Sequence, residues 1–103
     1  MDDVECPDYY VVPRSLTDEQ IDLILHILTI TPIACAIITD LKDAELGRKL
    51  GPEVIHANTV ACAHELAAQI ARETGSPSII VGETRFFEAR YADGRKENIE
   101  HEI

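Results

Sequence analysis

The chain has 103 residues, of which 46% are hydrophobic, and a formal net charge of −10 at pH 7. This length suits one domain with one core, and the apolar fraction argues against a disordered chain. Residues 1–47 hold ten acidic and two basic side chains, whereas residues 48–103 hold nine and seven. So acidic a surface repels nucleic acid and anionic membranes and attracts basic partners, although acidity can also serve solubility alone.

The three cysteines indicate a reducing compartment. Cys6, Cys35 and Cys62 form no CxxC pair and are odd in number, so we expect free thiols. The first residues, MDDVEC, are acidic and polar, unlike a secretory signal. No apolar run approaches the roughly 20 residues that span a bilayer. We therefore expect a cytoplasmic protein with no membrane partner.

Residues 1–16 resemble an extended acidic leader that precedes a single α+β domain over residues 17–103. Within it, Pro7 and Pro13 bracket the strand-forming run Tyr-Tyr-Val-Val at residues 9–12. Prolines at both ends suit a short edge strand or an arm laid on the domain.

Residues 17–30 carry the strongest helix signal in the chain. Thr17 is placed as the N-cap, and Gln20 completes a capping box. Seven residues of the helix are apolar: Ile21, Leu23, Ile24, Leu25, Ile27, Leu28 and Ile30. The narrow stripe left for water consists of Asp22, His26 and Thr29. Because such a helix must be buried on several sides, we expect the rest of the chain, or a second subunit, to wrap it.

Residues 32–41 allow two interpretations. Pro32 after Thr31 suits a first helical turn, and one helical face would hold Ile33, Ile37, Leu41 and Ala44. The run IACAIIT is also of the short, partly β-branched kind found in buried strands, and periodicity alone does not separate the two. We favour a helix. Residues 43–50 are predicted to be helical in either case, with Gly51 as the stop signal.

The last predicted helix covers residues 58–74. Asn58 is placed as its N-cap and Gly75 as its C-terminal stop. The predicted apolar face consists of Val60, Ala63, Leu66, Ala67, Ile70 and Ala71. Its many alanines would allow close approach to another helix, and residues 17–30 are the nearest candidate.

The pattern changes to strands from Ser78 onwards, with a strand at residues 79–81, another at 85–91 and a charged edge strand at 96–103. A three-residue loop at residues 92–94 would set Phe87 opposite Ile99, whereas a two-residue loop would pair Arg90 with Glu97. We prefer the first register because it pairs apolar with apolar. The predicted fold is therefore α+β, with two to three helices packed on a small, mainly antiparallel sheet formed by the C-terminal strands.

The candidate catalytic and metal-binding residues do not form a recognisable site. Cys62 and His64 are two positions apart on a helix and point in opposite directions. His64-Glu65 begins an HExxH motif, but Ala68 stands where the second histidine belongs. Cys35, with His26 or His56 as a base, sits among apolar residues, where a buried structural thiol is the better interpretation. We therefore expect no catalytic residue, no metal site and no cofactor.

Two further patterns have structural explanations. These are the possible phosphate loop around Gly47 and Gly51, and the basic, aromatic C-terminal segment. Lys49 is followed by Leu50 rather than the Ser or Thr of a phosphate loop. The basic residues after Arg85 alternate with glutamates, so cross-strand pairing accounts for them better than nucleic-acid binding does.

We expect the chain to be a small acidic binding protein, an inhibitor or regulator that covers a basic surface of a partner protein. If the partner binds nucleic acid, the carboxylates act by charge mimicry. The predicted partner-binding residues are Asp2, Asp3, Glu5, Asp8, Asp18, Glu19, Asp22, Asp40, Asp43 and Glu45. The alternative is a self-associating structural or regulatory module, a homodimer driven by the apolar excess of residues 21–30 and by the exposed edges of the C-terminal strands.

Overall fold

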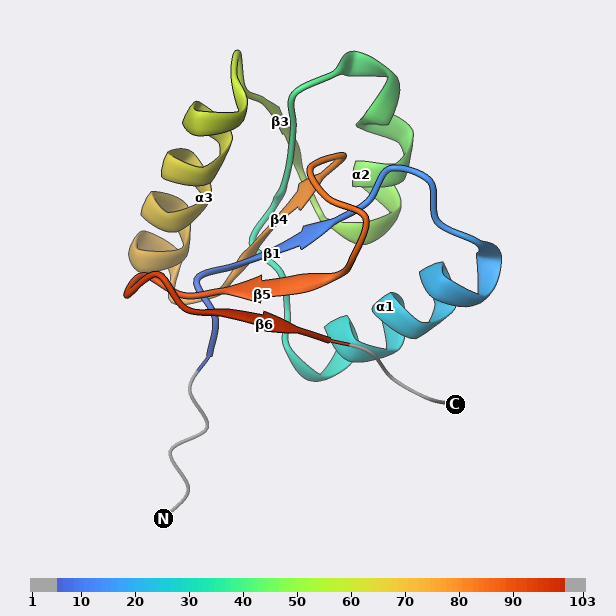
Figure 1. Cartoon of the computed structure of the whole chain (residues 1–103), viewed down its shortest axis with the longest axis horizontal. Coiled ribbons are helices and arrows are strands. Elements are labelled where there is room, and N and C mark those ends of the chain that lie inside the picture. The colour runs from blue at the N-terminus through green and yellow to red at the C-terminus, as the bar shows by residue number, and fades with distance from the viewer. Residues whose placement is uncertain (1–5, 100–103) are drawn as a thin grey trace.

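The computed structural model describes residues 6–99 and shows a six-stranded sheet with helices on both faces (Figure 1). The strands are β1 (Tyr9–Val12), β2 (Ala36–Ile38), β3 (Val54–His56), β4 (Ser78–Val81), β5 (Glu88–Arg90) and β6 (Lys96–Asn98). The helices are α1 (Asp18–Ile30), α2 (Ala44–Leu50) and α3 (Val60–Thr74), and a short 3₁₀ helix, η1 (Leu41–Asp43), precedes α2. The side chains of α1 and α2 pack on one face and those of α3 on the other. The α+β class and the three helices packed on a sheet are therefore confirmed.

The sheet has the strand order β3-β2-β4-β1-β5-β6. Its first four strands run parallel, and β5 and β6 add two antiparallel pairings. The sheet is thus mixed, and it is not formed by the C-terminal strands alone, because three of its strands come from the first 56 residues. Parallel neighbours need crossover connections, and α1, α2 and α3 supply them.

The helix prediction for residues 32–41 is wrong, because Ala36–Ile38 form β2 in the middle of the sheet. Ala36 and Ile38 face α1 and α2, while Ile37 faces α3, and all three are buried. A strand covered on both faces is apolar at every position, so it lacks the alternation that marks a half-exposed strand.

The edge-strand prediction for the leader is also wrong. β1 lies inside the sheet, parallel to β4 on one side and antiparallel to β5 on the other. Val11 and Val12 are fully buried. Pro7 and Pro13 lie just outside the strand, where the ladder does not require their missing N–H groups. The prolines therefore mark where the strand ends rather than an exposed edge.

The predicted capping box of α1 is confirmed. Thr17 Oγ1 accepts a hydrogen bond from the Gln20 backbone N–H at 3.2 Å, and Gln20 Oε1 accepts one from the Thr17 N–H at 2.9 Å. The predicted wrapping is not found within residues 6–99: only Ile24 and Leu28 are buried in α1, and Ile30 is 74% exposed. Neither α1 nor any other described helix has the length and apolar character to cross a membrane.

α3 packs on the sheet and not on α1, which lies on the opposite face. Its buried residues are Ala63, Ala67 and Ala71. Their small side chains let the helix approach the sheet closely, so the predicted packing on residues 17–30 is wrong. Thr59, not Asn58, caps the helix by accepting the Cys62 N–H at 3.1 Å, and Gly75 ends it at a φ of 77° as predicted.

The predicted register of the C-terminal hairpin is confirmed. Ala89 pairs with Glu97, and the Ile99 N–H donates to the Phe87 carbonyl at 2.9 Å. The loop therefore has three residues, 92–94. β6 forms one edge of the sheet, and all three of its residues are exposed.

Candidate functional site

The carboxyl ends of the parallel strands bring an arginine and two aspartates together. Arg14 follows β1, whereas Asp40 and Asp43 follow β2. Arg14 Nη1 lies 3.5 Å from Asp40 Oδ2, and Arg14 Nη2 lies 3.5 Å from Asp43 Oδ2. The carboxyl ends of parallel strands are where α/β proteins usually bind ligands. The Asp43 side chain is only 5% exposed, so the deepest group of this Arg14 cluster is a carboxylate.

The Arg14 cluster requires a glycine after β4. Gly82 has a φ of 97°, and a Cβ atom there would lie 2.7 Å from Asp43 Oδ2. Asp40 accepts the Lys42 backbone N–H at 3.1 Å, and this hydrogen bond is the main reason why the pKa of Asp40 is lowered. Lys42 Nζ also lies 3.5 Å from Asp40 Oδ2. Two bases thus neutralise two acids within the chain, and the cluster adds little to a free acidic surface.

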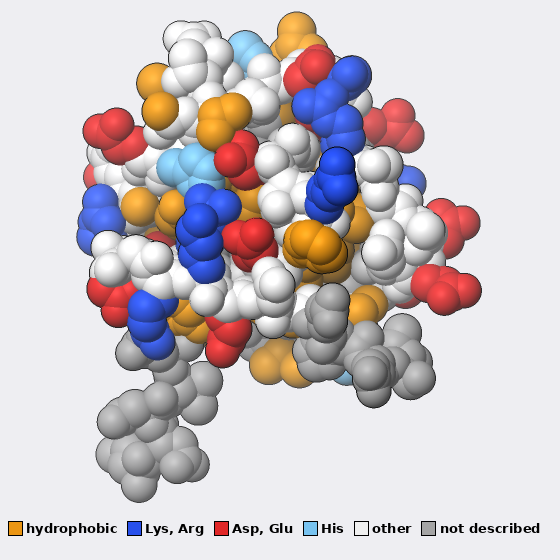
Figure 2. All heavy atoms as spheres, viewed as in Figure 1, with side chains coloured by type: hydrophobic (Ala, Val, Ile, Leu, Met, Phe, Trp, Pro, Cys, Tyr) orange, Lys and Arg blue, Asp and Glu red, His pale blue; other side chains and the backbone are white. Residues whose placement is uncertain are grey.

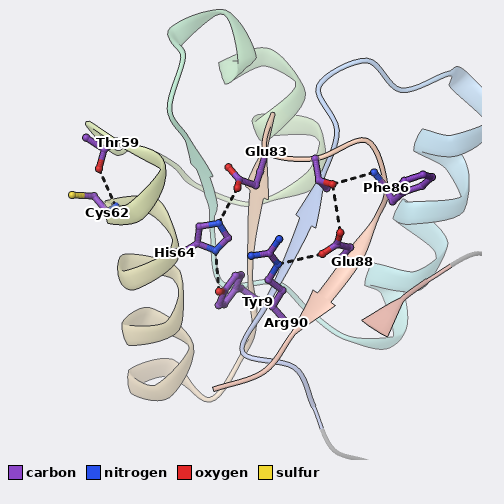
Figure 3. Close-up of polar contacts among 9 residues, drawn as sticks. Tyr9, Thr59, Cys62, His64, Glu83, Phe86, Glu88 and Arg90 are labelled. Atoms are coloured by element: carbon purple, nitrogen blue, oxygen red, sulfur yellow. Dashed lines mark hydrogen bonds and ion pairs between the residues drawn. The ribbon is translucent and has the colours of Figure 1, made fainter. Parts of the chain in front are cut away.

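A second polar group surrounds His64, which α3 presents to the sheet (Figure 3). Its Nδ1 lies 2.9 Å from the Tyr9 hydroxyl, and its Nε2 lies 3.1 Å from Glu83 Oε1. A neutral imidazole with its proton on Nε2 satisfies both contacts, because Nε2–H donates to Glu83 and Nδ1 accepts from Tyr9. His64 therefore ties α3 to β1 and to the segment after β4.

The network continues onto β5. Arg90 is the cross-strand partner of Tyr9 in the β1–β5 pairing, and Arg90 Nε lies 3.3 Å from Glu88 Oε2. The Thr84 hydroxyl donates to the other Glu88 oxygen at 3.4 Å. Burial raises the pKa of Tyr9, and Arg90 opposes that rise. The hydroxyl therefore keeps its proton at neutral pH and remains available as a donor to His64.

The His64 network contains the three groups of a catalytic triad, a carboxylate, a histidine and a hydroxyl, but its geometry fits a structural role. A histidine held between a carboxylate and a hydroxyl can act as a general base when the hydroxyl is to be activated. Here the hydroxyl belongs to Tyr9, whose pKa is raised rather than lowered. Both imidazole nitrogens and both Glu88 oxygens are already engaged. The geometry fits a structural role, in which the hydrogen bonds of His64 hold α3 against the sheet.

The partners of His64 were not predicted from the sequence. Tyr9 and Glu83 are 55 and 19 residues away in the chain. No local spacing connects residues so far apart. Only the sheet order, which puts β1 beside β4, could have brought them together.

Two of the cysteines, Cys35 and Cys62, lie in different surroundings. Cys35 is buried, its Sγ lies 3.7 Å from the Ser78 hydroxyl, and burial raises the pKa of its thiol. Cys62 is exposed, whereas His64 turns to the sheet (Figure 3), so the two do not share a site. Within the part of the chain that the structure describes, no three metal-ligating side chains converge.

The ten predicted partner-binding acids lie in different surroundings. Asp2, Asp3 and Glu5 lie outside the described residues. Asp8 is half-buried, and its Oδ2 is buried without a hydrogen-bond partner. Asp40 and Asp43 belong to the Arg14 cluster. The exposed acids of the set are Asp18, Glu19, Asp22 and Glu45.

Three of these exposed acids share the outer face of α1, which we define as Asp18, Glu19, Asp22, Leu25 and Ile30. Leu25 is 36% exposed and Ile30 is 74% exposed. In Figure 2, acidic side chains gather at the right margin, over α1, whereas acidic and basic side chains alternate over the sheet. The outer face of α1 thus combines negative charge with accessible apolar surface.

Comparison with known proteins gives no matching family model, no similar curated protein and no similar solved structure.

Proposed function

We propose that the protein is a small binding protein that covers a basic surface of a partner protein with the outer face of α1. The observation that carries the proposal is the exposure of three carboxylates and two apolar side chains on the outer face of one well-capped helix. Carboxylates attract and orient a basic partner, and apolar side chains supply the area that holds it. The role proposed is binding, not catalysis.

The charge of α1 favours a different protein as the partner of this face over a second copy. The helix contains no Lys or Arg, and its last turn carries no basic residue. Two copies of the outer face would bring like charges together, which costs free energy. A partner that carries Lys and Arg around an apolar patch complements both properties. If that partner normally binds nucleic acid, the three carboxylates take the place of phosphates.

The test is capture from the native cell lysate at about 0.1 M salt, where the Debye length is still roughly 10 Å. The baits are the wild-type chain and the variant D18N/E19Q/D22N. We expect the wild type to retain a basic protein that leaves in a high-salt wash, and the variant to retain severalfold less of it.

The matched control neutralises three exposed acids elsewhere, as E53Q/E65Q/E73Q. It has the same net charge as the α1 variant, so it should retain the partner more strongly. Acids in the first turn stabilise a helix by about 0.3–1 kcal/mol each, and circular dichroism must therefore show that α1 is still folded. Equal retention by both variants would contradict the proposal, as would the absence of any basic partner.

A further inference from the structure

The sheet has two free edges of different character, β3 and β6. β6 is Lys-Glu-Asn and exposed, which is how proteins protect an edge from further pairing. β3 is Val-Ile-His, with Val54 and Ile55 only partly covered, and no strand within residues 6–99 pairs with its outer side. The apolar edge is therefore the one open to another strand.

Within residues 6–99, no strand pairs with the backbone groups on the outer side of β3. The Ala36 N–H donates to the Glu53 carbonyl at 2.7 Å, and the Ala57 N–H donates to the Ile38 carbonyl at 2.8 Å. In a parallel ladder this spacing turns the N–H and C=O of Ile55 toward β2. The N–H and C=O groups of Val54 and His56 consequently point outward.

We propose that two copies of the chain pair through β3, antiparallel and with a two-fold axis at Ile55. Val54 of each copy then forms a hydrogen-bonded pair with His56 of the other. Ile55 meets its own equivalent at the closer, non-hydrogen-bonded position. The outward N–H and C=O groups of Val54 and His56 in one copy match those of His56 and Val54 in the other. A second copy therefore satisfies every outward backbone group of the strand.

The side chains also favour this pairing. The two-fold axis puts Val54 opposite His56 and Glu53 opposite Ala57, so no two carboxylates face each other. The same operation at β6 would centre on Glu97, whose carboxylate would face its own equivalent. The resulting dimer has one continuous sheet and does not use the outer face of α1, so it stands or falls independently of the proposed function.

The first test compares two proline variants by light scattering during size exclusion, over a range of protein concentrations. His56→Pro removes an outward N–H of β3 without removing a hydrogen bond to β2. Asn98→Pro likewise removes an outward N–H of β6 without removing a hydrogen bond to β5. We expect the wild type and Asn98→Pro to run at twice the chain mass of 11.4 kDa, and His56→Pro at the single-chain mass with an unchanged circular dichroism spectrum. A monomeric wild type at every concentration, or a dimeric His56→Pro, would overturn the proposal.

A second test does not depend on proline being tolerated. Ile55→Cys, in a chain with Cys6→Ser and Cys62→Ser, places two thiols across the axis. Cα atoms of a non-hydrogen-bonded pair lie about 4.5 Å apart, within the range of a disulfide. We expect oxidation to give a covalent dimer under denaturing electrophoresis, whereas Glu97→Cys in the same background stays a monomer. Equal cross-linking of both variants, or none at Ile55→Cys, would contradict pairing through β3.

Discussion

The two long helices are attached to the sheet in opposite ways. α3 buries three alanines against the sheet and adds polar contacts from His64 to Tyr9 and Glu83. α1 has the better local signals, with a full capping box and larger apolar side chains, yet it buries only Ile24 and Leu28. Local sequence signals thus predict where a helix forms, whereas packing on the sheet determines how much of the helix is buried. The loosely covered helix carries three of the exposed acids predicted to bind a partner, Asp18, Glu19 and Asp22.

The largest effect should come from the two buried residues of α1. Ile24→Ala leaves a cavity over the sheet and should lower the free energy of unfolding by about 2–5 kcal/mol. Leu25→Ala, one position along, should cost less than about 1 kcal/mol because that side chain is already exposed. Denaturant unfolding of both variants measures the difference. Similar costs would show that α1 is covered on both sides.

The alanine contact of α3 should be sensitive to added volume. Ala67 is fully buried against the sheet, so Ala67→Leu should lower the free energy of unfolding by about 1–3 kcal/mol through overpacking. The control is Ala61→Leu on the exposed side of the same helix, which should change stability by less than about 0.5 kcal/mol. If thermal and denaturant unfolding gave Ala67→Leu the stability of the control, the close packing of α3 would be refuted.

The His64 network should contribute a smaller amount. Tyr9→Phe removes the hydroxyl that donates to His64 and should cost about 1–2 kcal/mol, because half-buried partners lose a hydrogen bond. Tyr91→Phe removes an exposed hydrogen bond to Glu97 and should cost less than about 0.5 kcal/mol. Chemical denaturation at neutral pH compares them. Equal costs would mean that the network does not fasten α3.

The smallest effect concerns Asp40, at the end of β2. Its pKa is lowered in the folded chain, so its charge stabilises the fold above the unfolded pKa of about 3.9. That contribution is lost as the pH falls through the lower folded pKa. Asp40→Asn keeps the acceptor for Lys42 but not the charge. The stability difference between wild type and variant should therefore favour the wild type at neutral pH and disappear in acid. A difference that stays constant with pH would contradict this assignment.

Local features of this chain were predictable, and those made by the sheet were not. The capping box of Thr17 and Gln20 and the register that pairs Phe87 with Ile99 each depend on neighbouring residues, and both were predicted correctly. β2 was missed because burial on both faces removes its alternation. The polar clusters were missed because their members come from separate strands and helices.

The acidic surface illustrates the same limit. Asp43 counts as one more negative charge in the sequence, but Arg14 pairs with it and the fold buries it. Composition gives the total charge and leaves open which charges a partner can reach. The outer face of α1 follows only from the structure.

The central claim is that α1 is held to the fold less firmly than α3. Native-state hydrogen exchange of the backbone amides tests it most directly. We expect the amides of α1 to open at a clearly lower free energy than those of α3 between Ala63 and Ala71, whose protection should approach that of global unfolding. Equal protection of the two helices would contradict it, because α1 would then be as firmly integrated as α3 and would need no partner to cover its outer face.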